Sequence, residues 1–176
     1  GTRLIADAFS ASAGAAAASR VLVSASAVGF YGDRGDELLD ETSSSGDGFL
    51  ADVVRRWESA AEPARAAGIR TVHPRMGVVL SPTGGALQRL LVPFRLGVGG
   101  RIGAGNQWMS WVALDDTVRA IAFALDDGAL RGAVNVVAPA PVTNAEFAAA
   151  LARVLSRPAF LPVPAVALRA MFGEMA

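Results

Sequence analysis

The sequence predicts an α/β fold in which a parallel sheet carries helices on its faces. Short apolar runs at residues 20–24, 69–80 and 133–137 alternate with longer segments of helical periodicity. Strands and helices that alternate along the chain are typical of parallel sheets. Small polar residues follow the run at 20–24 directly, and this pattern indicates a buried strand that opens into a loop at its carboxyl end.

The composition predicts a folded domain and argues against several classes of function. Of the 176 residues, 52% are hydrophobic and 18% are charged, which is enough for a core and argues against disorder. The 16 basic and 16 acidic residues balance, so we expect no nucleic-acid partner and no attraction to anionic lipid. No apolar stretch is long enough to span a bilayer, and the absence of cysteine excludes disulfides and fits a cytoplasmic protein. The single histidine, His73, argues against a metal centre.

The N-terminal half is expected to hold two helices around the first strand. Residues 2–18 are Ala-rich and helical in pattern, and residues 32–48 form a long polar loop. Asp47 is placed to cap the next helix, which Pro63 weakens or kinks and Gly68 ends. The expected buried stripe of that helix comprises Phe49, Val53, Trp57 and Ala61.

The C-terminal half is expected to continue the same alternation. Pro74 and Gly77 interrupt the strand at 69–80, a short helix occupies 87–96, and residues 108–114 are extended. Asp115 or Asp116 caps a further helix. Thr143 and Glu146 have the spacing of a capping box for the helix that follows, and Pro162 and Pro164 introduce a last helix. The expected buried stripes are Val118, Ile121, Ala122 and Leu125 in the first of these helices, and Phe147, Leu151, Val154 and Leu155 in the second.

Hydroxyl side chains gather at the expected carboxyl end of the first strand. Ser24, Ser26 and Tyr31 lie within residues 24–32, directly after the apolar run. Ligands of open α/β sheets bind at this edge, so these side chains are candidates for chemistry. A structural interpretation stays open beside the functional one: the serines satisfy backbone groups in a turn, and the sole tyrosine is an aromatic plug.

Other candidate sites have stronger structural interpretations. The Gly-rich segment 97–105 follows a helix and leads into an extended segment, so a hinge is favoured over a phosphate loop. His73 lies within a strand, which favours a structural histidine. Asp115 and Asp116 are more economically a cap and its neighbour than an acid/base pair. Trp108 and Trp111 either pack in the core or line a substrate cleft.

Six segments, taken in this order, carry a resemblance to a known family. They are residues 24–32, 40–42, 48–58, 74–87, 107–116 and 135–147. Together they resemble the NAD-dependent epimerase/dehydratase family of extended short-chain dehydrogenases/reductases, and more closely its atypical branch, called only epimerase family proteins. The resemblance covers nearly the whole chain. It implies the C-terminal half of a Rossmann-like parallel sheet with part of a small substrate-binding subdomain, to which residues 97–114 and 138–176 contribute.

The resemblance also implies a site and its ligands. A serine after the fifth strand of such proteins polarises a substrate hydroxyl or carbonyl; Ser26 matches it best, and Tyr31 closes the same segment. The expected ligands are NAD or NADP and a small carbonyl or nucleotide-sugar-like substrate, with no metal, and a homodimer is expected. Asp116 matches a structural helix cap. The site residues implied are Ser26 and Tyr31 for catalysis, Ser24, Arg75, Met76 and Gly77 for the cofactor, and Trp108 for the substrate.

Two features of the chain depart from the family pattern. The helix after the long loop should hold a Tyr-x-x-x-Lys pair, but it has Phe49, Leu50, Val53 and Val54, and all 16 basic residues of the chain are arginine. The glycine fingerprint on the first strand and the ribose-reading residue after it are also missing, so we expect a fragment truncated at both ends. Because the catalytic pair is missing, the alternative to an enzyme is a non-catalytic NAD(P)-binding sensor or regulatory module.

Overall fold

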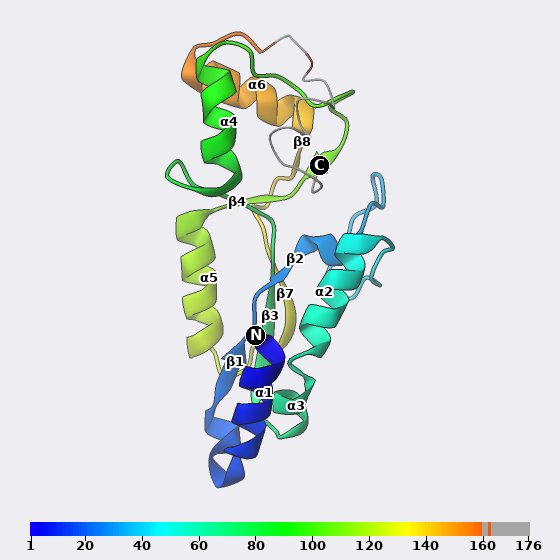
Figure 1. The fold of residues 1–176 in the computed structure, drawn as a ribbon, viewed down its shortest axis with the longest axis vertical. Coiled ribbons are helices and arrows are strands. Elements are labelled where there is room, and N and C mark those ends of the chain that lie inside the picture. Colours follow the sequence, from blue (N-terminus) through cyan, green and yellow to red (C-terminus); the bar gives the residue numbers. More distant parts are fainter. Residues whose placement is uncertain (160–161, 163–176) are drawn as a thin grey trace. The chain divides into compact units, whose positions relative to one another are not determined.

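The computed structural model describes residues 1–159 and 162 (Figure 1). The chain divides into two compact units: Gly1–Gly77 with Leu114–Val137, and Val78–Ala113 with Ala138–Ala176. The last helix expected after Pro162 lies outside the described residues. In the described part of the chain, no helix is long and apolar enough to cross a membrane.

The first unit is built on a parallel sheet centred on β3 (Arg70–Met76). Both β1 (Val21–Val23) and β2 (Ser26–Ala27) pair with one edge of β3, and β7 (Gly132–Val136) pairs with the other. All three pairings are parallel. Pro74 sits inside β3 without breaking it, so the interruption of the predicted strand comes from Gly77 alone. The parallel α/β fold predicted from the sequence is confirmed.

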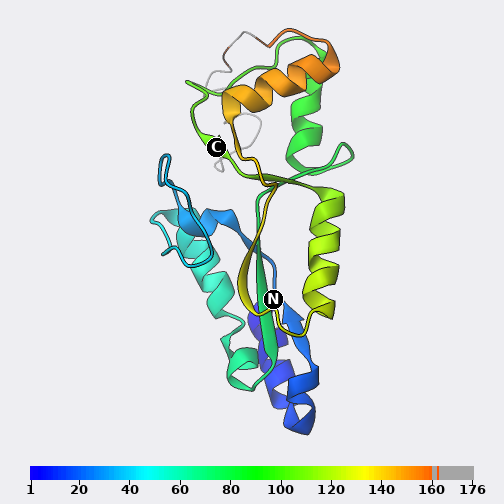
Figure 2. The same ribbon diagram turned by 180° about the vertical axis from the view of Figure 1, so that it is seen from behind.

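Helices cover both faces of this sheet. In both views α2 (Phe49–Ser59) and α5 (Leu114–Asp126) lie on opposite sides of β3 and β7 (Figures 1 and 2). The remaining helical segments of the unit are α1 (Thr2–Ala11), α3 (Glu62–Ala66) and two 3₁₀ turns at Gly14–Ser19 and Val28–Tyr31. A core of small and aliphatic side chains joins α1 and α3 to the sheet: Ala6, Ala13, Leu22, Ala61, Ala64 and Ile69.

The second unit holds two short strand pairs and two helices. β4 (Val78–Leu80) pairs in parallel with β6 (Trp111–Ala113), and β5 (Trp108–Met109) pairs antiparallel with β8 (Val142–Thr143). The helices α4 (Gly85–Arg95) and α6 (Asn144–Leu155) pack together through Phe94, Ala148 and Ala152. The Gly-rich segment 97–105 runs from α4 toward β5 and lies wholly within the second unit, so the expected hinge between subdomains is wrong.

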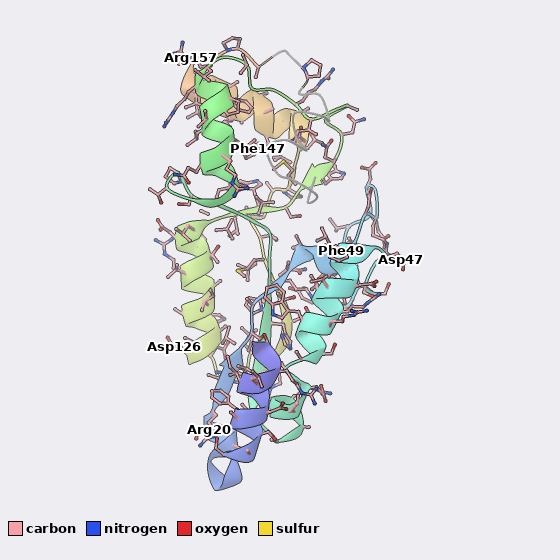
Figure 3. All side chains as sticks on the ribbon, viewed as in Figure 1. Arg20, Asp47, Phe49, Asp126, Phe147 and Arg157 are labelled. Atoms are coloured by element: carbon pink, nitrogen blue, oxygen red, sulfur yellow. The ribbon has the colours of Figure 1, made fainter. Side chains whose placement is uncertain are left out.

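The buried stripe predicted for the helix that begins with α2 is wrong at three of its four residues. Phe49 is 79% exposed (Figure 3). Val53 and Trp57 are exposed as well, and only Ala61, just beyond the end of α2, is buried. The residues that face inward are Ala51 and Val54, followed at the same helical spacing by Glu58. Gly29 lies against this part of α2, where an added Cβ would make ordinary van der Waals contacts with Leu50 and Val54 at 3.7 and 4.0 Å. The apolar residues used for the prediction therefore lie on a neighbouring, exposed face of the helix.

The predicted stripes of the two later helices are also partly wrong. In α5 the buried residues are Thr117 and Ala124, whereas Val118 and Leu125, one position further round the helix, are exposed. In α6 the buried apolar residues are Ala148 and Ala152, and Val154 is 78% exposed. In each helix the smaller side chain faces inward because it lets the backbone approach its neighbour.

The predicted helix starts are confirmed in one case and wrong in two. Thr143 and Glu146 form the complete capping box of α6. The N-cap of α2 is Gly48, without a side-chain hydrogen bond, so Asp47 does not cap it. Because α5 begins at Leu114, Asp115 and Asp116 lie inside its first turn, where a carboxylate stabilises the helix dipole without being the N-cap.

Arg70 ties the end of α5 to the start of β3. Its guanidinium donates to the carbonyls of Ala124, Leu125 and Leu130 at 2.8–3.0 Å. The carbonyls of Ala124 and Leu125 belong to the last turn of α5, where intrahelical donors run out, and that of Leu130 lies beyond the helix. We expect Arg70→Met to lower the free energy of unfolding by about 1–3 kcal/mol in chemical denaturation. The control is Arg119→Met, since the exposed ion pair of Arg119 with Asp116 should contribute almost nothing; equal effects of the two variants would contradict this account.

Candidate active site at the carboxyl edge of the sheet

Three polar side chains share one row across the parallel sheet. Ser26 of β2 lies opposite Arg75 of β3, and Arg75 lies opposite Asn135 of β7. Residues in register on neighbouring strands point to the same face and lie about 4.8 Å apart. The row is near the carboxyl ends of the strands, which is the edge where open α/β sheets bind ligands.

Arg75 is buried, and its guanidinium is bound on three sides. Its Nε and Nη2 donate to the two carboxylate oxygens of Glu58 at 2.9 and 3.0 Å. Its Nη1 donates to the Tyr31 hydroxyl at 3.0 Å, and the ring of Phe30 lies 3.5 Å from the guanidinium carbon. Because the planar fork matches a carboxylate and stacks on a ring, Arg75 is held in a single orientation.

Glu58 compensates the buried charge and also binds Ser26. The Ser26 hydroxyl donates to the Glu58 carboxylate at 2.6 Å. Burial alone would raise the pKa of Glu58, but the hydrogen bonds from Arg75 and Ser26 and the charge of Arg75 hold it below its ordinary value. Burial likewise opposes the charge of Arg75, whereas Glu58 and Tyr31 keep the pKa of Arg75 above its ordinary value. Both members of the pair are therefore ionised at neutral pH.

Tyr31 links this pair to β7 and to the long loop. Its hydroxyl donates to the Asn135 side-chain oxygen at 2.7 Å. The backbone N–H of Asn135 donates to the Glu41 carboxylate at 2.7 Å, which ties the loop of residues 32–48 to the strand. The loop then closes on Tyr31, since a Cβ on Gly46 would lie only 2.0 Å from the Tyr31 carbonyl oxygen. Glycine at this position is therefore required by packing.

The structure brings together three of the residues predicted for the site. Ser26, Tyr31 and Arg75 belong to one hydrogen-bonded network, and all three are almost fully buried. Sequence reasoning missed Glu58, Asn135 and Glu41. A signal for Glu58 was present, because it continues the inward spacing of Ala51 and Val54 in α2. For Asn135 and Glu41 the sequence offered no local signal, since their contacts lie 104 and 94 residues away along the chain.

The other predicted site residues lie beside the network or apart from it. Ser24 is buried, and its backbone N–H donates to the Val72 carbonyl. Met76 pairs with Ala27 and Val136 at the end of β3, and the N–H of Gly77 donates to the Val136 carbonyl at 3.1 Å. Trp108 is half-exposed in β5 of the second unit.

His73, two residues before Arg75, is partly buried beside the same network. Its Nδ1 is buried without a hydrogen-bond partner, and a cavity of about 250 Å³ lies against it, lined by Glu58, Ser59, Ala61, Glu62, Arg65 and Thr71 as well. In the part of the chain that the structure describes, no group of ligand side chains could hold a metal ion. The structural role expected for His73 from the sequence stays a prediction.

Comparisons with known proteins place the chain among named relatives. No family model matches it. It is 52% identical over 155 residues to an epimerase family protein of Mycobacterium bovis, an alignment that covers 88% of this chain and 52% of that protein. The chain is a homologue of the epimerase family proteins. It spans about half the length of the curated relatives it matches.

Solved structures agree with this homology. The crystal structure of human epimerase family protein SDR39U1 with NADPH superposes with a TM-score of 0.79 at 34% identity, covering 98% of this chain and 58% of the human one. A nucleoside-diphosphate sugar epimerase from Corynebacterium glutamicum gives a TM-score of 0.76 at 41% identity, with 96% and 36% coverage. The resemblance and the Rossmann-like fold expected for this epimerase-family homologue are confirmed.

The histidine of this epimerase-family homologue should make its stability sensitive to mild acid. Burial is the main cause that holds the pKa of His73 below its ordinary value of 6.5, although the nearby Glu58 carboxylate opposes the shift. The unfolded chain then takes up a proton near pH 6.5 that the folded protein takes up only at lower pH. The contribution of His73 to the free energy of unfolding is complete above pH 6.5 and is lost as the pH falls from there through the folded pKa. The loss is no more than about 1.4 kcal/mol per pH unit.

Because His73 is the only histidine, one substitution tests this expectation. The free energy of unfolding should decrease between pH 7 and pH 5.5, and His73→Gln should flatten the dependence in that range. The neighbouring Glu58 carboxylate is not expected to titrate there, since its pKa is lowered. An unchanged slope in the variant would show that His73 is not the group responsible.

Proposed function

We propose that this chain supplies the substrate-facing part of an NAD(P)-dependent epimerase or oxidoreductase acting on a small carbonyl or nucleotide-sugar-like substrate. The observation that carries the proposal is the convergence of two hydroxyls on one buried ion pair at the carboxyl edge of a parallel sheet: Ser26 donates to Glu58, and Tyr31 accepts from Arg75. Homology to the epimerase family proteins supports it, and the human relative has been crystallised with NADPH.

The proposed chemistry needs a proton to move at a substrate oxygen, and the two hydroxyls are the groups placed to move it. The Tyr31 proton points to Asn135 in this structure, and the Ser26 proton points to Glu58. A substrate oxygen that replaces Asn135 as the acceptor can receive the tyrosine proton, and Ser26 polarises the same oxygen once its own proton turns from Glu58 to the substrate. The nicotinamide, when bound, supplies the hydride acceptor and donor.

The residues at the strand ends fit a nicotinamide in part. Met76 and Gly77 end β3 at the ligand-binding edge, and Ser24 follows β1. The Arg75 side chain, however, is bound to Glu58 and Tyr31, so we propose that it serves Tyr31 rather than the cofactor. The Gly-rich segment 97–105 follows α4, whereas a dinucleotide fingerprint must follow a strand and open a helix.

The second unit is proposed to belong to the substrate-binding subdomain. We place there residues 97–114 and 138–176 of the sequence-based expectation, with Trp108 as a substrate contact. A cytoplasmic location rests on the absence of cysteine. The homodimer stays a prediction, to be tested by sedimentation.

This 176-residue chain by itself should bind NAD(P) only weakly. Dinucleotide affinity in Rossmann-like folds depends on backbone N–H groups that hold the pyrophosphate at the start of the first helix. Within the described residues, the glycine turn Gly84–Gly85 between β4 and α4 does not have the G-x-G-x-x-G spacing of such a site. Isothermal titration with NADH and NADPH, alongside a thermal melt, should give no micromolar binding. Micromolar affinity in a cooperatively folded monomer would contradict the proposed placement of the cofactor.

Substitutions of the two hydroxyls test the proposal in a protein of the relatives' full length that contains this chain. Ser26→Ala and Tyr31→Phe should each lower turnover on a carbonyl or nucleotide-sugar panel by about 10²- to 10⁴-fold, the usual contribution of a positioned proton donor. Asp116→Asn is the matched control, because Asp116 is exposed and pairs only with Arg119 among the contacts found for it.

The outcome also separates an enzyme from the non-catalytic alternative. Equal losses of turnover in Ser26→Ala and Asp116→Asn would show that Ser26 is not part of the catalytic site. NADPH binding without turnover on any member of the panel would favour a sensor or regulatory module.

A further inference from the structure

The Tyr31 hydroxyl is bound by an arginine in a chain that contains no lysine. The hydroxyl oxygen accepts a hydrogen bond from Arg75 at 3.0 Å, and its proton is donated to Asn135 at 2.7 Å on the other side. A hydroxyl rotates to suit its partners, so a fixed donor on one side decides where its proton points. The position of the Arg75 guanidinium therefore controls the orientation of the Tyr31 proton.

Arg75 in turn is positioned by a residue that has no hydrogen bond to Tyr31 among those found in the described part of the chain. Glu58 of α2 binds Nε and Nη2 of Arg75, which leaves Nη1 directed at the tyrosine. The side chain of Glu58 is only 15% exposed and that of Arg75 only 5%, so water competes little for these bonds. The same carboxylate accepts the Ser26 proton at 2.6 Å.

We propose that Glu58 is the positioning residue of this site, and that it orients both hydroxyls at once. It orients Ser26 directly, and it orients Tyr31 through Arg75, which provides the cation next to the tyrosine. The inference rests on the proposed function only in taking these hydroxyls as the groups that meet the substrate. The network itself is independent of turnover.

The variant Glu58→Gln distinguishes two roles of Glu58: positioning Arg75, and merely filling the space with a side chain of this size. Glutamine keeps the shape and one acceptor oxygen, but its NH₂ group faces the Arg75 guanidinium, donor against donor. One of the two bonds that align Arg75 is lost, and Nη1 is released from its fixed direction. If Glu58 only filled space, Glu58→Gln would leave the hydrogen bonds of the Tyr31 hydroxyl unchanged.

The chain has only one tyrosine, so its hydroxyl can be observed alone. In protein labelled with ¹³C at the tyrosine Cζ, a single resonance reports hydrogen bonding at Tyr31. We expect Glu58→Gln to shift this resonance although residue 58 does not contact Tyr31, and Arg75→Lys to shift it as well. Glu62→Gln is the matched control, since Glu62 lies on the neighbouring helix in an exposed pair with Arg65. Ser26→Ala is a control inside the network, because it leaves the Glu58–Arg75–Tyr31 chain intact.

A folded Glu58→Gln protein with an unshifted resonance would overturn the proposal, as would a shift of equal size in Glu62→Gln. If Glu58→Gln does not fold, Glu58→Asp keeps the charge and retracts the carboxylate, and the same shift is expected. Turnover is measured on the same variants. A shifted resonance in a protein that turns over no substrate supports the positioning and contradicts the proposed function, so the two failures are distinguishable.

Discussion

The buried ion pair between Glu58 and Arg75 is the interaction on which the sheet edge depends. An unpaired guanidinium inside a sheet would cost several kcal/mol, so Arg75 can occupy β3 only because α2 brings a carboxylate to it. The pair then sets the partners of its neighbours. Ser26 donates to the carboxylate, and Tyr31 accepts from the guanidinium.

This constraint also explains the long loop and the position of α2. The Tyr31 hydroxyl donates a hydrogen bond to the side chain of Asn135, and the backbone N–H of Asn135 donates to Glu41 of the loop. The loop closes on the Tyr31 carbonyl at Gly46, and α2 follows with Glu58 directed inward. The segment from Ser26 to Glu58 is thus fastened at both ends by the same network. A site assembled in this way holds its hydroxyls rigidly before any ligand arrives, which is the arrangement that positioned proton transfer requires.

The sequence predicts the layout of the fold better than it predicts the contacts of the site. Strands at 20–24, 69–80 and 133–137 could be found because apolar runs and turn residues are local signals, as is the capping box at Thr143 and Glu146. The inward face of α2 was missed because its larger apolar residues, such as Phe49 and Trp57, lie on an exposed face. Ser26 and Tyr31 were found from their place after the first apolar run, and Arg75 was found through the resemblance. Asn135 meets Tyr31 from 104 residues away along the chain, and no pattern of neighbouring residues encodes that contact, whereas the signal for Glu58 lay in its spacing from Ala51 and Val54 in α2.

A double-mutant cycle on Glu58 and Arg75 tests this account most directly. Each single variant, Glu58→Gln and Arg75→Met, leaves one partner buried without compensation and should lower the free energy of unfolding by about 3–5 kcal/mol. The double variant removes both charges, so it should be more stable than the sum of the two losses predicts, with a coupling of at least about 2 kcal/mol. Strictly additive losses would contradict the account, because they would show that the two side chains stabilise the sheet edge independently.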